Sequence, residues 1–301
     1  MEFYMETEAG KIHCCWWLPN GKPKGIVQLI HGVNEYAARY APLAEFLTTH
    51  GFHVVAADHP GHGSSVGEND RFGYLTGGWM AAVKVVHQLH GMTAEQFPDL
   101  PYFMLGHSMG SFLLRTYLFT YHTDLAGALI SGTGWMSPAI LAAGRLLCRE
   151  EAARLGWEQH SPTLQQIMFG PYNKQFAPNR TPYDWLSRDE AVVDAYAADP
   201  FCTWKPTVQL CYEMLGGLQL IQKKQNLARM QKKLPVFFFA GQQDPVGANG
   251  NGVLKAVQAF KDAGMEQVTV ELYQEMRHEC HNEVGKERVW HEILSWLDNL
   301  V

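Results

Sequence analysis

The amino-acid sequence predicts an α/β fold in which a mainly parallel, doubly wound sheet is interrupted by a helical insertion. Short apolar runs of strand length alternate with longer helical stretches along residues 25–131, and the alternation resumes over 234–301. Between 135 and 233 the strand signal disappears. Parallel strands are covered by helices on both faces, so they appear in a sequence as continuous apolar runs. We therefore expect residues 1–134 and 234–301 to form one core, and 135–233 to form a helical cap inserted into it.

The first part of the chain supplies most of the predicted strands. Residues 2–8 and 11–18 have the pattern of a leading β-hairpin. The apolar runs that follow predict buried strands at 25–31, 52–58, 102–106 and 125–131. Between these strands, 3.6-residue periodicity predicts helices at 42–50, 78–97 and 109–121. Gly51 is placed to end the first of these helices.

The second part of the chain contains the insertion and the end of the sheet. Helical patches are predicted at 138–155, 162–169 and 206–231, around a middle segment rich in proline and aromatic residues. Two further strand–helix pairs are predicted as strand 234–240 with helix 250–263, and strand 267–273 with helix 282–299. Ligands of such sheets bind at the carboxyl ends of the strands, so we expect the functional residues there.

The composition excludes several classes of protein. With 47% hydrophobic and 18% charged residues, the chain can fill a large core and is not a disordered polymer. Its net charge of -6 provides no basic surface for nucleic acid. The N-terminus is acidic and lacks the apolar stretch of a secretory signal, and no run of about 18 apolar residues could span a bilayer. We expect a soluble, cytoplasmic protein with no transmembrane segment; its oligomeric state is open.

The strongest motif is Gly106-His107-Ser108-Met109-Gly110, a G-x-S-x-G between a predicted strand and a predicted helix. A sharp strand-to-helix turn exposes the serine hydroxyl at the edge of the sheet, and its glycines avoid collisions with neighbouring backbone. This context identifies Ser108 as a candidate nucleophile.

A serine hydroxyl needs a general base, and that base needs a partner that fixes its tautomer. Asp244 follows the predicted strand 234–240, and His278 follows the strand 267–273. On its own, Asp244 before a proline is also typical of a surface turn. The order Ser, Asp, His is that of the α/β-hydrolase fold and favours the catalytic interpretation. His281 is the rival base, but we expect it in the first turn of the last helix, solvated or capping.

Two backbone N–H groups would complete such a site as an oxyanion hole. Met109 at the start of its helix is one candidate, and Val33 in the loop after strand 25–31 is the other. No metal is expected. His278 and His281 are three residues apart rather than four as in H-E-x-x-H, and the six cysteines show no C-x-x-C spacing. Reduced thiols without a disulfide or zinc are the expectation.

The chain resembles the monoacylglycerol lipase and lysophospholipase group of α/β-hydrolases, also described as serine aminopeptidase-like. The matching segments are His31-Gly32-Val33-Asn34-Glu35 with Arg39-Tyr40, Asp58-His59-Pro60-Gly61-His62-Gly63-Ser64-Ser65, Gly106 to Gly110, Gly241 to Val246, and His278-Glu279. Within the insertion, residues 184–189 and 198–202 are similar to bacterial members described as lysophospholipases. The chain departs from the pattern at Asn34 and Tyr36, where relatives often carry Gly and His.

The resemblance implies hydrolysis of a lipid-like or other small-molecule acyl ester through an acyl-serine intermediate, with no cofactor. Alternatives are a carboxylesterase or thioesterase acting on small soluble acyl donors, and a peptidase. A non-catalytic binding module on the same scaffold is disfavoured by the complete set Ser108, Asp244 and His278. Acyl length and head group are open.

The insertion is expected to lie over Ser108 as a cap. We expect some of its apolar residues to line an acyl channel, the candidates being Ile140, Leu141, Leu146, Leu147, Leu164, Ile167, Met168, Leu215, Leu218 and Leu220. Met168, Phe169, Trp185 and Trp204 could line a lipophilic tunnel or form the core of the insertion, and the core interpretation is favoured for each of them.

Overall fold

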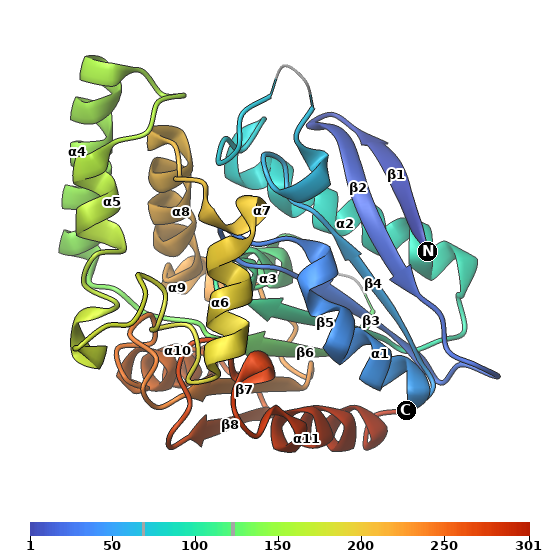
Figure 1. The fold of residues 1–301 in the computed structure, drawn as a ribbon. Coiled ribbons are helices and arrows are strands. Elements are labelled where there is room, and N and C mark those ends of the chain that lie inside the picture. The colour runs from blue at the N-terminus through green and yellow to red at the C-terminus, as the bar shows by residue number, and fades with distance from the viewer. Residues whose placement is uncertain (68–69, 122–123) are drawn as a thin grey trace.

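A computed structural model describes residues 1–67, 70–121 and 124–301 of the chain. Its eight-stranded sheet has the order β1-β2-β4-β3-β5-β6-β7-β8 (Figure 1). The strands are β1 (Glu2–Thr7), β2 (Gly10–Trp17), β3 (Gly25–Ile30), β4 (Phe52–Ala57), β5 (Tyr102–His107), β6 (Leu125–Ser131), β7 (Val236–Gly241) and β8 (Val268–Tyr273). The strands from β4 to β8 in this order pair in parallel, whereas the β1–β2 hairpin joins β4 antiparallel. The predicted fold class is confirmed.

Burial explains why these strands could be predicted from sequence. Every residue of β3, β4, β5 and β7 is buried, so both faces of each strand need apolar side chains. The observed strand ends lie within two residues of the predicted ones.

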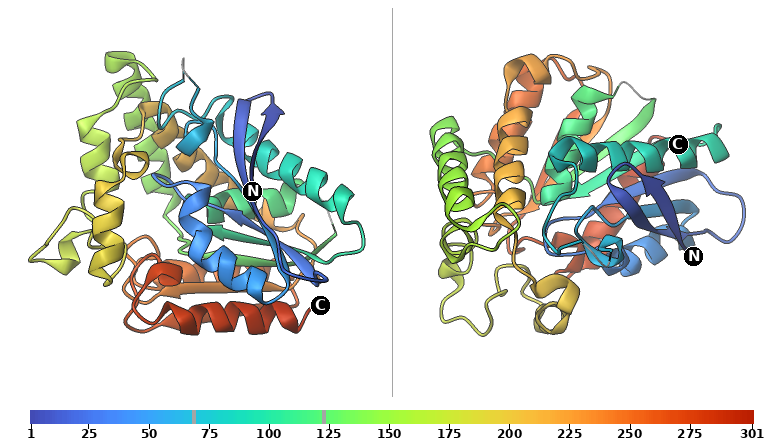
Figure 2. Two further views of the ribbon diagram at one scale, coloured as in Figure 1. Left: turned by 45° about the vertical axis from the view of Figure 1, so that its right-hand side comes forward. Right: turned by 90° about the horizontal axis from the view of Figure 1, so that it is seen from above.

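Helices cover both faces of the sheet. α1 (Ala41–Thr49) and α11 (Lys286–Asp298) pack on one face, and their buried residues join one core cluster with Val27, Phe103 and Phe239 of the sheet. α2 (Gly78–Gln96), α3 (Met109–Thr120) and α10 (Asn251–Asp262) contribute to the cluster on the other face. In the left view of Figure 2, α11 (red) runs along the lower side of the sheet. This is the doubly wound arrangement.

Between β6 and β7, residues 132–235 form helices and loops and contain no strand. The helices are α4 (Pro138–Leu155), α5 (Pro162–Met168), α6 (Glu190–Ala198), α7 (Pro200–Thr203), α8 (Val208–Ile221) and α9 (Lys224–Leu227). The predicted helical patch 206–231 is therefore two helices. α6 and α7 lie in the middle segment rich in proline and aromatic residues, for which no helix was named. Their N-caps are Asp189 and Asp199, whose carboxylates accept the first free N–H groups.

Much of the insertion shares the core of the sheet, whereas Leu186, Tyr196 and Cys202 form a small separate cluster within it. α8 lies between α4 and the helix layer of the sheet (Figure 1), and its buried residues belong to the same cluster as those of α2 and α3. Gly217 of α8 is so close to Trp79 of α2 that a Cβ there would lie 2.4 Å from the indole ring. The helix is thus anchored directly to the core.

The last helix begins later than predicted. Residues Cys280–Asn282 form a short 3-10 helix, and α11 starts at Lys286 after Gly285, whose φ of 81° interrupts the helical path. No helix in the described ranges is long and apolar enough to cross a membrane.

Candidate active site

Ser108 lies in the sharp turn between β5 and α3. Its φ of 52° and ψ of -121° are unusual for a residue other than glycine and mark a strained elbow. The turn requires close packing, because a Cβ on Gly110 would lie 1.9 Å from the carbonyl oxygen of Ile30. A Cβ on Gly32 would likewise approach the Cβ of Ser108 to 2.9 Å. These contacts explain the glycines of the G-x-S-x-G and His-Gly motifs.

Asp244 and His278 are adjacent in space, although they lie 34 positions apart in the chain. Asp244 Oδ2 lies 3.0 Å from Nδ1 of His278, and both side chains are buried. The separation is within the range of a hydrogen bond. Asp244 Oδ1 accepts a hydrogen bond of 2.9 Å from the N–H of Val246, which fixes the carboxylate in its loop after β7.

The surroundings of His278 favour its charged form more than burial opposes it. Burial alone would lower the pKa of His278, but the charge of Asp244 and the contact with it outweigh burial, so the pKa is raised above the ordinary 6.5. His107 lies on one side of the ring at 4.6 Å between centroids, and Trp185 from the insertion lies at 5.0 Å. Burial lowers the pKa of His107 well below 6.5, so this neighbour stays neutral.

His281 is not solvated, as was predicted, but 1% exposed. Its ring stacks on Tyr40 with 4.9 Å between centroids and an interplanar angle of 14°. Burial lowers its pKa to about 4. The prediction was wrong because the short 3-10 helix Cys280–Asn282 turns the side chain into the core before α11 begins.

Side-chain hydrogen bonds hold the backbone of the loop after β3. His31 Nε2 accepts from the N–H of His59 at 2.9 Å, so the ring proton is on Nδ1, which donates to the carbonyl of Gly32 at 2.8 Å. In a planar trans peptide the C=O and the following N–H point in opposite directions. The N–H of Val33 is therefore directed away from His31, and Val33 lines the cavity that contains Ser108. Met109 is the first residue of α3, so its N–H has no acceptor within the helix.

A buried charge cluster that the sequence analysis did not predict lies next to this loop. Arg39 bridges Glu35 at 2.8 Å and Glu279 at 2.9 Å. Tyr40 also donates to Glu35 at 2.8 Å, and the N–H of Gly32 donates to the same carboxylate. Burial and Glu279 raise the pKa of Glu35 despite Arg39, whereas Arg39 holds the pKa of Glu279 below its usual range despite burial. The only sequence signal is the position of the two glutamates beside the His-Gly motif and His278.

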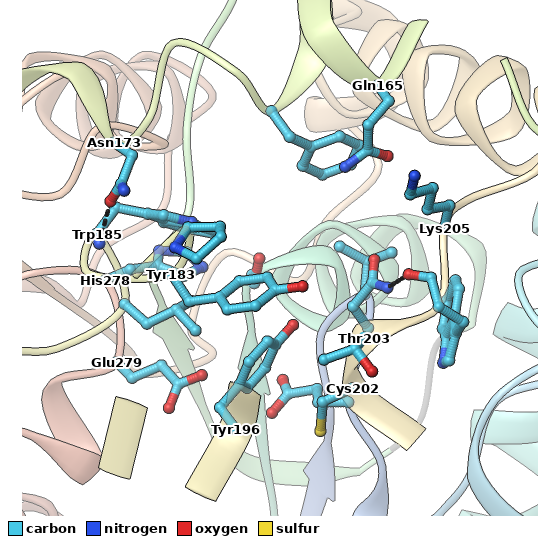
Figure 3. Close-up of a pocket in the computed structure, with 18 of the residues that line it drawn as sticks. Gln165, Asn173, Tyr183, Trp185, Tyr196, Cys202, Thr203, Lys205, His278 and Glu279 are labelled. Atoms are coloured by element: carbon cyan, nitrogen blue, oxygen red, sulfur yellow. Dashed lines mark hydrogen bonds between the residues drawn. The ribbon is translucent and has the colours of Figure 1, made fainter. Parts of the chain in front are cut away.

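Ser108 and His278 line one cavity of about 470 Å³. Its floor comes from the loop after β3, from the Ser108 turn and from His278-Glu279, and its other walls come from the insertion. Figure 3 shows the hydroxyl groups of Tyr183 and Tyr196 directed into this space, with Trp185 beside His278. The insertion residues in the wall are mainly aromatic or amide side chains, among them Gln165, Gln166, Phe169, Asn173, Tyr183, Trp185, Tyr196 and Trp204.

The predicted acyl-channel residues are wrong, because none of the ten lines this cavity. Leu141, Leu164, Leu215 and Leu218 are buried in the main core, and Leu147, Met168 and Leu220 pack against it. Ile140, Leu146 and Ile167 are more than half exposed. Conversely, Phe169, Trp185 and Trp204 line the cavity, although each was interpreted as core. The buried leucines of α4 and α8 attach the insertion to the sheet, and the wall is formed by α5, α6, α7 and the loops around them.

A known protein family matches most of the chain. The family described as serine aminopeptidase, S33, matches residues 21–285. The chain belongs to this family. It is a serine ester hydrolase of the α/β-hydrolase fold. This agrees with the resemblance inferred from its motifs.

Similar proteins are esterases and lipases. Mouse monoglyceride lipase is 26% identical over 308 residues, which cover 99% of this chain and 90% of the relative. Monoacylglycerol lipase of Mycolicibacterium smegmatis is 28% identical over 286 residues, covering 93% of this chain and 90% of the relative. The crystal structure of a thermostable carboxyl esterase from Bacillus coagulans, in complex with glycerol, superposes with a TM-score of 0.92 at 29% identity, covering 100% and 98% of the two chains.

Proposed function

We propose that this S33 family member hydrolyses carboxylic esters of the monoacylglycerol or lysophospholipid type through an acyl-serine intermediate. The observation that carries the proposal is the set of groups around one cavity. Ser108 occupies the strained elbow, and His278 lines the same cavity with its Nδ1 3.0 Å from the buried carboxylate of Asp244. Names of relatives such as monoglyceride lipase support the substrate class.

In the proposed reaction, Ser108 Oγ attacks the carbonyl carbon of the ester while His278 Nε2 takes the hydroxyl proton. The tetrahedral intermediate collapses, the bond to the alcohol oxygen breaks, and His278 returns the proton to that oxygen. Water then attacks the acyl-serine with the same base, releasing the acid and restoring Ser108. Asp244 orients His278 and stabilises its protonated form. No cofactor takes part in this proposal.

The oxyanion of each tetrahedral intermediate would be bound by the N–H groups of Val33 and Met109. The direction of the Val33 N–H supports this role, because the Gly32 carbonyl on the other edge of the same peptide is held by His31. Met109 adds a free N–H at the positive end of α3.

Residues 135–233 would act as the cap of a core formed by 1–134 and 234–301. In support, the insertion supplies most of the residues that line the cavity apart from the Ser108 and His278 loops.

The six cysteines are buried free thiols, which supports a proposed location in the reducing cytoplasm.

A second candidate is a carboxylesterase acting on short acyl donors. The cavity wall favours it, because most insertion residues in the wall are aromatic or amide side chains rather than the aliphatic residues expected of a long acyl channel. The two candidates share the mechanism and differ only in what fills the cavity beyond the carbonyl group.

A series of glycerol monoesters from acetyl to palmitoyl tests the substrate class. If the cavity binds an acyl chain, kcat/KM will rise with length by up to about fourfold per methylene, since each buried CH₂ contributes about 0.8 kcal/mol at most. The rise will stop when the cavity is full. Preference for acetyl or propionyl esters would instead establish the short-chain carboxylesterase. Lysophospholipids and aminoacyl amides of matched acyl length would separate head-group preference and peptidase activity.

The pH profile of kcat/KM should report the ionisation of His278. Only neutral His278 can take the serine proton, so activity will fall as pH drops through its pKa, with a midpoint above 6.5 because Asp244 raises that pKa.

Asp244→Asn should lower kcat by about 10⁴-fold through loss of tautomer control. It should also move the midpoint downward. Stopped assays from pH 5 to pH 9 would measure both, and a flat profile would contradict the role of His278.

A further inference from the structure

One segment of the insertion is bonded directly to the loop that carries Val33. Asn34 Nδ2 donates to the carbonyl of Trp204, and the hydroxyl of Tyr36 donates to Asp199 Oδ2 at 2.8 Å. The Tyr36 ring also contacts Phe201 edge-on, with 5.4 Å between centroids. The two hydrogen bonds therefore join residues 199–204 to the loop at two points.

Both bonds are made by the side chains of Asn34 and Tyr36, so a substitution at either position can remove one bond and leave the backbone in place. Asn34 has a φ of 58°, in the left-handed region that asparagine tolerates better than most residues. It can thus take a backbone conformation suited to glycine and still present an amide to the insertion.

The insertion side of the contact is itself rigidly held. The two oxygens of the Asp199 carboxylate accept different hydrogen bonds. Oδ1 accepts from the N–H of Phe201 at 2.8 Å and caps α7, and Oδ2 accepts from the hydroxyl of Tyr36. The indole N–H of Trp204 donates to the carbonyl of Phe201 at 2.8 Å. The same short segment places Cys202, Thr203 and Trp204 in the cavity wall.

On the other side, the loop is held by the core. His31 holds the Gly32 carbonyl, and Glu35 accepts from the Gly32 N–H. The Val33 N–H therefore lies between an anchor on the core and an anchor on the insertion. Movement of residues 199–204 would be transmitted through Asn34 to the peptide that carries this N–H.

We propose that Asn34 and Tyr36 are positioning residues that couple the 199–204 segment of the cap to the oxyanion N–H of Val33. This rests on the proposed function. A substrate that packs against Thr203 and Trp204 fixes the position of residues 199–204. The two hydrogen bonds then hold the Val33 N–H where the oxyanion develops. The bonds contribute to the transition state more than to substrate binding, so their loss acts on kcat rather than on KM.

The test uses variants that keep the backbone. Asn34→Gly retains access to the left-handed φ and removes the amide, and Tyr36→Phe removes only the hydroxyl. Each should lower kcat about fivefold, the effect of one hydrogen bond, with KM changed less than twofold. The Ki of a trifluoromethyl ketone, which forms a tetrahedral adduct with the serine, should rise by the same factor as kcat/KM falls. Hydrogen exchange in residues 199–204 should become faster.

Two controls separate coupling from other effects. Asn34→Asp also tolerates a positive φ but has no N–H to donate, so it should lose activity as Asn34→Gly does; full activity would attribute the glycine effect to backbone flexibility. Tyr212→Phe removes a hydroxyl that accepts from Arg149 at 3.0 Å within the insertion, and it should leave kcat unchanged.

Unchanged kcat and unchanged Ki in Asn34→Gly and Tyr36→Phe, with faster exchange at 199–204, would overturn the coupling. If Ser108→Ala is inactive in the same experiment, the proposed function stands and only this inference fails. If Ser108→Ala retains full turnover, the proposed function itself fails.

Discussion

Replacement of Ser108 by alanine will lower kcat for ester hydrolysis by about 10⁶-fold, the loss expected when the nucleophile of a serine hydrolase is removed. The geometry of the turn supports the assignment of Ser108 as the nucleophile. Ser108 has a strained φ of 52° and lines the cavity together with His278. A fluorophosphonate probe should label Ser108 in the wild-type chain, because at neutral pH such electrophiles react with a base-activated serine.

Peptide mapping of the labelled protein gives the site directly. Ser137→Ala is a suitable control, because Ser137 caps α4 on the exposed surface and should leave both labelling and turnover intact. Labelling at another serine, or full turnover by Ser108→Ala, would show that the nucleophile has been assigned wrongly.

His278→Ala should be about as inactive as Ser108→Ala, since the base and the nucleophile act as one unit. His281→Ala should retain most activity. The difference follows from their contacts. His278 lies 3.0 Å from Asp244 and has a raised pKa, whereas His281 stacks on Tyr40 and has its pKa lowered to about 4 by burial. Within the described parts of the chain, neither ring nitrogen of His281 has a hydrogen-bond partner.

The His281 comparison needs a second variant, because truncation of a buried ring leaves a cavity and can destabilise the fold. His281→Phe keeps the stack on Tyr40 and removes the titratable nitrogens. Steady-state rates and thermal unfolding should be measured on the same samples. A folded His281→Phe with no turnover, or an active His278→Ala, would reverse the assignment of the base.

The strands were predictable because the local sequence and the final environment agree. β3, β4, β5 and β7 are buried on both faces, so each appears as a continuous apolar run. The short helices in the middle of the insertion and the start of the last helix were harder to predict. α6 and α7 follow the N-cap residues Asp189 and Asp199 and span only nine and four residues, and α11 starts after Gly285 rather than at Asn282.

The lining of the cavity was predicted wrongly for a related reason. An apolar periodicity predicts that a helix face is buried but does not reveal which surface buries it. Leu215 and Leu218 of α8 turned out to pack into the main core, and the aromatic residues in the loops of the insertion face the cavity instead.

By itself, the sequence determined the sheet, the family and the three candidate residues Ser108, Asp244 and His278, because motif, flanking elements and chain order are local or sequential properties. Tertiary structure alone decided the ion pairs of Arg39 with Glu35 and Glu279, and the bonds of Asn34 and Tyr36 to the insertion. The Arg39–Glu279 pair spans 240 positions. Such contacts depend on how separate elements pack in three dimensions. The spacing of residues along the chain does not reveal which of them lie close together in the folded protein.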